Sequence, residues 1–175
     1  KARGKLIDLG CGRMQYRREL EPLLESYTGL DHPKVSKDYQ SDDAPDILAD
    51  IHKMPIKNGV YDTALMFQVL EYLENTPKAL SEVSRILKRG SFLIVSTPFM
   101  YPIHDSGLDR NRYTDVALKT LLGHAKFKVV KIKSYGNFIQ FVVLSFNVFL
   151  LKTVKKYISK NKLLFFLLPL ALSLA

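Results

Sequence analysis

The chain has 175 residues and is 47% hydrophobic, which is enough to bury the core of one compact domain. Cys11 is the only cysteine, which excludes a disulfide framework, and neither His32 nor His52 has the spacing of a metal ligand, so we expect no metal. The net charge of +9 comes from residues 116–175, which contain ten lysines and no Asp or Glu. Such a charge favours nucleic acid or an anionic membrane as a partner.

Turn residues divide the chain into short apolar runs. The runs predict strands at 5–9, 27–30, 46–49, 61–67, 91–96 and 127–132. Leucine spacing predicts a helix at 16–26. Thr76, followed by Pro77, predicts a capped helix that stops at Gly90, and Thr114 predicts the cap of the next helix.

Strands that alternate with helices predict an α/β fold, namely a Rossmann-like, doubly wound, mostly parallel sheet with helices on both faces. An apolar, lysine-rich helical segment follows, so we expect a domain at 1–135 and an extension at 136–175. In open α/β sheets ligands bind at the carboxyl ends of the strands. The residues predicted at those ends are Gly10, Asp31, Asp50, Gln68 and Ser96.

The first predicted strand continues into Leu-Ile-Asp-Leu-Gly-Cys-Gly at residues 6–12. Two glycines let the backbone approach a ligand closely, and the acid Asp8 at the strand end suits a cofactor that carries positive charge. This stretch resembles the first motif of class I methyltransferases that use S-adenosylmethionine. The order of the predicted elements extends the resemblance over roughly residues 5–133.

The resemblance implies S-adenosylmethionine as the cofactor and assigns roles to residues along the sheet edge. Asp8 would hold the methionine ammonium, directly or through water. Asp31, 19 positions after Gly12, would accept the ribose hydroxyls. Asp50 would meet the adenine amino group and Ile51 the adenine ring. The implied cofactor-binding residues are Asp8, Gly10, Cys11, Gly12, Asp31, Asp50, Ile51 and Gln68.

A dinucleotide-binding dehydrogenase shares the strand, the glycine turn and the distal acid. Its fingerprint requires a third glycine where this chain has Gln15, which favours the methyltransferase. The chain departs from most family members at Met14, where they have a glycine or another small residue, so we expect a tighter loop or a lower affinity. The structural alternatives are that Asp8 caps a helix and that Cys11 is a small loop residue.

Residues 96–114 combine aromatic and charged side chains in a long irregular segment, which is usually functional in a compact domain. The segment resembles Thr-Pro-Phe…Pro-x-His…Asp…Arg-Tyr-Thr in bacterial methyltransferases associated with cell-envelope glycan biosynthesis. His104 is the candidate base for an oxygen acceptor. Arg112 would hold an anionic substrate group, and Tyr113 completes the predicted catalytic set. The alternative is that Asp109, Arg112 and Tyr113 form a structural clamp.

Two apolar runs, 138–151 and 163–175, flank five lysines between 152 and 162. Neither run reaches the ~18–20 residues of a membrane-spanning helix. Apolar runs separated by lysines suit an interfacial or re-entrant element at an anionic bilayer, and the lack of Arg argues against nucleic acid. The alternative is that both runs are buried in a larger core.

No secretory signal precedes the first strand, so we expect a cytoplasmic protein at the inner face of the membrane. Because the chain begins at Lys1 and ends in an apolar run, we treat both termini as truncation points. The leading hypothesis is methyl transfer to a small or lipid-linked acceptor such as a sugar of an envelope glycan. The alternatives are a quinone-like lipid acceptor and a non-catalytic member that binds a membrane or a partner. The pattern leaves the oligomeric state open.

Overall fold

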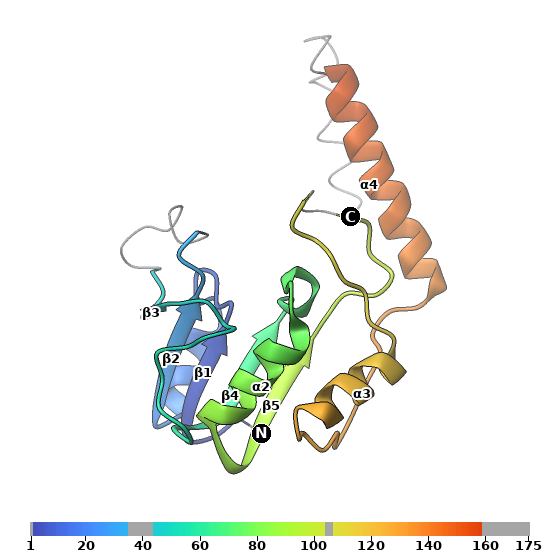
Figure 1. Cartoon of the computed structure of the whole chain (residues 1–175). Helices are drawn as coiled ribbons and strands as arrows, with labels where there is room; N and C mark the ends of the chain where they lie inside the picture. The colour runs from blue at the N-terminus through green and yellow to red at the C-terminus, as the bar shows by residue number, and fades with distance from the viewer. Residues whose placement is uncertain (1, 35–43, 104–106, 159–175) are drawn as a thin grey trace. The chain divides into compact units, whose positions relative to one another are not determined.

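The structure is a computed structural model that describes residues 2–34, 44–103 and 107–158, without the side chains of 152 and 154–158. It comprises two units, one of residues 1–99 and 103–132 and one of residues 100–102 and 133–175. The first unit holds the sheet and most of the helices, and the second holds helix α4, as Figure 1 shows by label.

Five parallel strands form the sheet in the order β3-β2-β1-β4-β5. Their bounds are β1 (Lys5–Leu9), β2 (Ser26–Asp31), β3 (Ile47–Leu48), β4 (Tyr61–Phe67) and β5 (Leu87–Ser96). The direction of winding reverses between β1 and β4, which is the switch point of a doubly wound sheet. The predicted Rossmann-like fold is confirmed.

Helices cover both faces of the sheet. Successive strand residues point to opposite sides, so the apolar residues of a strand need a packing partner on each face. On β1, Ile7 packs in a cluster with α2 (Thr76–Ile86) and α3 (Asp115–His124), whereas Leu6 packs in a second cluster with residues of α1 (Arg17–Leu20). Figure 1 shows α2 lying along one face. The short helices η1 (Glu21–Leu23) and η4 (Leu70–Tyr72) complete the unit.

The ends of β2, β3 and β5 differ from the predicted strands by one to four residues, and β5 begins at Leu87 rather than at residue 91. Three further differences concern the helices. The helix expected at 16–26 is interrupted, because Pro22 has no amide hydrogen to donate and the chain tightens into η1. The side chain that caps α2 is Asn75, which accepts from the Lys78 amide at 3.1 Å, rather than Thr76. α2 ends at Ile86 rather than at Gly90, because Leu87 turns to an extended conformation and pairs with Tyr61.

The strand predicted at 127–132 is wrong. These residues form no regular element, and the Phe127 amide instead closes the turn after α3 by donating to the Leu122 carbonyl at 2.9 Å. Within the described part of the chain, β5 pairs with β4 alone, so residues 127–132 have no hydrogen-bonded neighbour that would hold them extended. The predicted cap at Thr114 is confirmed, since its hydroxyl accepts from the Ala117 amide at 3.2 Å.

Helix α4 (Phe138–Ile158) runs from the first apolar stretch into the lysines without a break. Among the described residues, no helix combines the length and the apolar character that crossing a bilayer requires.

Candidate functional site

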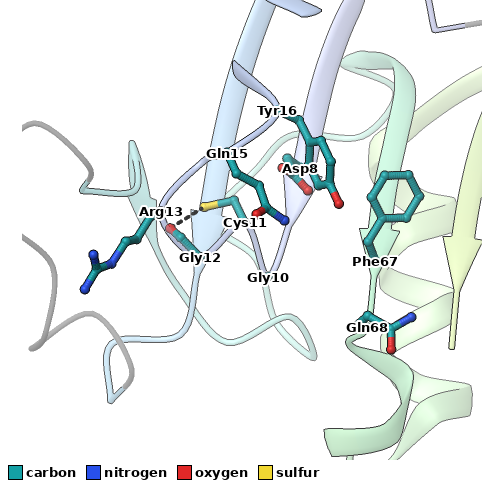
Figure 2. A pocket seen from close by; sticks show the side chains of 9 residues that line it. All are labelled: Asp8, Gly10, Cys11, Gly12, Arg13, Gln15, Tyr16, Phe67 and Gln68. Atoms are coloured by element: carbon teal, nitrogen blue, oxygen red, sulfur yellow. Dashed lines mark hydrogen bonds between the residues drawn. The ribbon is translucent and has the colours of Figure 1, made fainter. Parts of the chain in front are cut away.

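A cavity of about 300 Å³ opens where β1 and β4 end, at the switch point of the sheet. Figure 2 shows its lining, which comes from the end of β1, the glycine loop and the end of β4. The lining residues are Asp8, Gly10, Cys11, Gly12, Arg13, Gln15, Tyr16, Phe67 and Gln68. The cavity thus brings together five of the residues that the sequence assigned to the cofactor.

The glycine loop lies tightly against its neighbours. The amides of Gly10 and Cys11 donate to the Leu30 carbonyl at 2.8 and 3.2 Å, which ties the loop to β2. Gly10 has a φ of 70°, and a Cβ there would lie 2.4 Å from Cγ2 of Val69. Only glycine meets both requirements, so the first glycine of the motif is a steric necessity of this turn.

Met14 occupies the position at which the chain departs from most of its family. Its φ of 49° lies in the left-handed region that glycine favours, so the backbone of Met14 is strained. Met14 is also buried, with 6% of its surface exposed. The side chain fills the space above Gly29, where a Cβ would lie 2.7 Å from Sδ of Met14. Packing against β2 therefore offsets the backbone strain at Met14.

Asp8 is the acid of the cavity wall. The residue is 2% exposed, and its Oδ2 accepts a hydrogen bond from the hydroxyl of Tyr27. Burial raises the pKa of the Asp8 carboxyl, Asp31 raises it further, and the hydrogen bond from Tyr27 opposes both. Asp8 does not cap α1, whose N-cap is Tyr16.

At the end of β4, Gln68 has a left-handed φ of 55°. The backbone N–H of Gln68 donates to the Ser96 carbonyl at 3.0 Å, and the side-chain Nε2 donates to Ser96 Oγ at 3.0 Å. These bonds join the ends of β4 and β5, which were predicted to share one edge. A strained residue held by two bonds beside a cavity is typical of a functional site.

The acids predicted for ribose and adenine lie outside the cavity lining. Asp31 is 8% exposed and accepts from the Gly12 amide at 2.9 Å and from the His32 amide at 2.7 Å. The backbone hydrogen bond from His52, at 2.9 Å, is the main cause of the lowered pKa of Asp50. Ile51 is 8% exposed and belongs to the main core. The roles of these three residues in cofactor binding stay predictions.

Of the predicted catalytic residues, His104 lies outside the described residues. Arg112 donates through both terminal nitrogens to Asp109, with 2.7 Å between Nη2 and Oδ2, and this pairing raises the pKa of its guanidinium. The Tyr113 hydroxyl lies 2.7 Å from Thr76 Oγ1, at the start of α2. These are the contacts of the structural clamp, and a catalytic role for either residue stays a prediction.

The segment that carries Arg112 is fastened to η4. The amides of Arg110 and Asn111 donate to the Glu71 carbonyl at 2.8 and 3.0 Å. Asn111 also donates through its side chain to the Leu73 carbonyl at 2.8 Å. Residues 110–113 are therefore held beside η4 and α2, which follow the end of β4.

Neither Tyr27 nor Tyr16 was predicted from the sequence to belong to the site. Both Tyr16 and Phe67 line the cavity, and their rings contact each other edge-to-face with centroids 5.3 Å apart. Tyr27 shares a face of β2 with Asp31, four residues later, because side chains alternate along a strand, and that spacing was the available signal. Nothing in the spacing reveals that the ring reaches Asp8 on the neighbouring strand.

Comparison with known proteins gives a family match and distant relatives. A family model described as "Methyltransferase domain" matches residues 7–95, just over half of the chain. A sterol 4-C-methyltransferase of Caenorhabditis elegans is 28% identical over 98 residues, which are 51% of this chain and 29% of that protein. A malonyl-[acyl-carrier protein] O-methyltransferase of Buchnera aphidicola is 28% identical over 96 residues, 53% of this chain and 38% of that protein. The chain therefore spans well under half the length of these curated relatives.

Among solved structures, an S-adenosylmethionine-dependent methyltransferase from Mesorhizobium loti superimposes with a TM-score of 0.61 at 19% identity, covering 79% of this chain and 81% of that one. At this identity the likeness concerns the fold.

Proposed function

Because the chain belongs to the methyltransferase domain family of class I, S-adenosylmethionine-dependent enzymes, we propose that it transfers the cofactor's methyl group to a small-molecule acceptor. The observation that carries the proposal is the buried carboxylate of Asp8 on the wall of a cavity beside a glycine loop. The cavity lies at the switch point, where ligands bind in doubly wound sheets.

The residues present fit this cofactor. Oδ2 of Asp8 is held by Tyr27, while Oδ1 makes no hydrogen bond within the described part of the chain. An ammonium group would meet that oxygen as a charge-assisted partner. The rings of Tyr16 and Phe67 add an aromatic wall that suits a cation.

Asp8 would hold the ammonium, Asp31 the ribose hydroxyls, and Asp50 with Ile51 the adenine. Gly10, Cys11 and Gly12 would follow the cofactor with their backbone, and Gln68 would face the substrate side. When bound, the cofactor supplies a methyl group activated by its sulfonium. The protein's part is to bind, orient and exclude water, since methyl transfer is an in-line displacement that depends on positioning.

Calorimetric binding of S-adenosylhomocysteine tests the cofactor site. Asp31→Ala should weaken binding by about 10- to 100-fold, because charged hydrogen bonds to the ribose are lost at about 1.5–3 kcal/mol. Asp115→Ala, an exposed change at the start of α3, is the control and should leave binding unchanged. Unchanged binding in the Asp31 variant contradicts the ribose placement, and no binding by the unaltered protein contradicts the cofactor proposal.

For the acceptor, we favour a sugar of an envelope glycan, either free or lipid-linked, with a quinone-like lipid as the second candidate. His104 would act as the base, Arg112 would hold an anionic group and Tyr113 would complete the acceptor side. If His104 is the base, His104→Ala should lower turnover by ~10²–10⁴-fold and leave cofactor affinity intact. A radiolabelled methyl assay on extracted glycans and lipids separates the two acceptor classes.

A lipid-linked acceptor would suit a protein that sits at an anionic membrane surface. The apolar residues 138–151 of α4 are followed by Lys152, Lys155 and Lys156 on the same helix. Each lysine near an anionic leaflet contributes about 1 kcal/mol, so together they are worth about a hundredfold in partitioning. The apolar residues would add burial at the headgroup boundary.

Co-sedimentation of the full chain with vesicles of phosphatidylserine and phosphatidylcholine tests this placement. Replacing Lys152, Lys155 and Lys156 by Gln should release the protein from anionic vesicles. The control replaces three lysines at 126, 128 and 131, before α4, and should retain more binding. If the unaltered protein partitions equally to anionic and neutral vesicles, the lysines do not attract it to an anionic membrane, and the proposed placement is ruled out.

A further inference from the structure

A buried tyrosine lies behind the acid of the cavity. Tyr27 is 5% exposed, does not line the cavity and donates its hydroxyl to Asp8 Oδ2. The strand register explains how they meet, because Leu6 pairs with Tyr27 and Asp8 pairs with Gly29. Leu6 and Asp8 point to the same face of β1, and Leu6 packs in one cluster with Tyr27, so the Tyr27 ring lies on the face of the sheet that carries Asp8.

The tyrosine is itself held in place by Arg17 of α1. The Arg17 guanidinium lies 5.2 Å from the centroid of the Tyr27 ring and donates to the Tyr27 carbonyl at 3.2 Å. Arg17 also pairs with Asp46, which accepts from the Gly29 amide at 2.7 Å. This arrangement fixes both the ring and the backbone of β2, so the hydroxyl has little freedom to leave Asp8.

We propose that Tyr27 is a positioning residue for ligand binding, whose hydroxyl holds Asp8 Oδ2 so that Oδ1 is presented to a cationic group in the cavity. The inference rests on the proposed cofactor binding and goes beyond it, since Tyr27 acts on the ligand only through Asp8. A buried carboxylate that loses its hydrogen-bond donor becomes easier to protonate. Binding an ammonium to a protonated Asp8 would require the release of that proton.

Of the groups around Asp8 that shift its pKa, only the Tyr27 hydroxyl favours the ionised form. Asp31 from β2 is a like charge, and Cys11 from the glycine loop is a neutral thiol whose pKa burial raises to about 12. The side chain of Arg13 points away from Asp8 in Figure 2. Arg17 stands behind Tyr27 rather than beside the acid. Without the hydroxyl, burial and Asp31 both oppose ionisation of Asp8.

The test compares two ligands in Tyr27→Phe, which removes only the hydroxyl. S-adenosylhomocysteine carries the ammonium, and 5′-methylthioadenosine lacks the whole amino-acid part. The variant should bind S-adenosylhomocysteine about tenfold or more weakly at pH 7, with 5′-methylthioadenosine unchanged within about twofold. The deficit should grow from pH 8 to pH 6, and calorimetry in buffers of different ionisation enthalpy should record additional proton release.

Two further variants separate positioning from general damage. Tyr61→Phe alters another buried tyrosine, which lies at the start of β4, whereas the cavity lies where β4 ends. This variant should leave the affinities for both ligands unchanged. In the Asp8→Asn background, Tyr27→Phe should have no further effect on S-adenosylhomocysteine binding. Equal weakening of the two ligands, or a deficit that does not vary with pH, overturns the role of Tyr27. If the unaltered protein binds neither ligand, the proposed function itself fails.

Discussion

Replacing Gly10 by Ala should lower the free energy of unfolding by about 2–5 kcal/mol, through two effects that the structure separates. The first is the φ of 70°, which costs an L-residue about 1–2 kcal/mol. The second is the distance of 2.4 Å between the new Cβ and Cγ2 of Val69, and overpacking of this kind costs about 1–3 kcal/mol. Urea unfolding followed by far-ultraviolet circular dichroism measures the sum, since the chain has no Trp.

Gly59 and Gly90 are matched controls for the first effect. Their φ values are 63° and 79°, and a Cβ on either would meet no atom within 4 Å. Each Ala variant should therefore lose only about 1–2 kcal/mol. Adding Val69→Ala to Gly10→Ala should recover the overpacking part, seen as a favourable coupling of about 1–3 kcal/mol in a double-mutant cycle. Comparisons of this kind carry an error of about 0.5 kcal/mol. If Gly10→Ala and Gly59→Ala lose the same free energy of unfolding within that error, the steric argument is refuted.

Three further outcomes are expected. The pKa of Glu82 is lowered mainly by its hydrogen bond from Arg85. The stability that this bond contributes is therefore complete at pH 7 and is lost as the pH falls below 4.5 through the lowered pKa. In urea unfolding, Glu82→Gln should cost about 1 kcal/mol at pH 7 and little at pH 3. Gly29→Ala should cost about 1–3 kcal/mol by the same measurement, because its Cβ would lie 2.7 Å from Sδ of Met14 and 2.9 Å from Sγ of Cys11. Met14→Ala should relieve only the part of that cost that comes from Met14. Cys11 is 6% exposed, and burial raises the pKa of its thiol to about 12. A disulfide reagent at pH 8 should therefore react with Cys11 in the folded protein at least about 100 times more slowly than in the unfolded protein. Fast modification of the folded protein would contradict the burial of Cys11.

Much of the fold followed from local patterns. The strand at 61–67 and the cap at Thr114 match the structure, because apolar runs and capping side chains act within a few residues. The strand predicted at 127–132 failed for the opposite reason. Its sequence is apolar enough for a strand, but a strand persists only beside a partner, and none pairs with these residues in the described part of the chain.

The amino-acid sequence by itself determined the glycine motif, the alternation of strands and helices, and the edge at which the polar strand ends meet. These features depend on neighbours in the chain, so periodicity and turn chemistry reveal them. Only the tertiary structure decided that Tyr27 holds Asp8, that Arg17 holds Tyr27, and that Met14 fills the space above Gly29. Each of these contacts joins residues on different parts of the chain. The pairing of β1 with β2, and the packing of the glycine loop and α1 against β2, bring them together, and a local pattern does not reveal such packing.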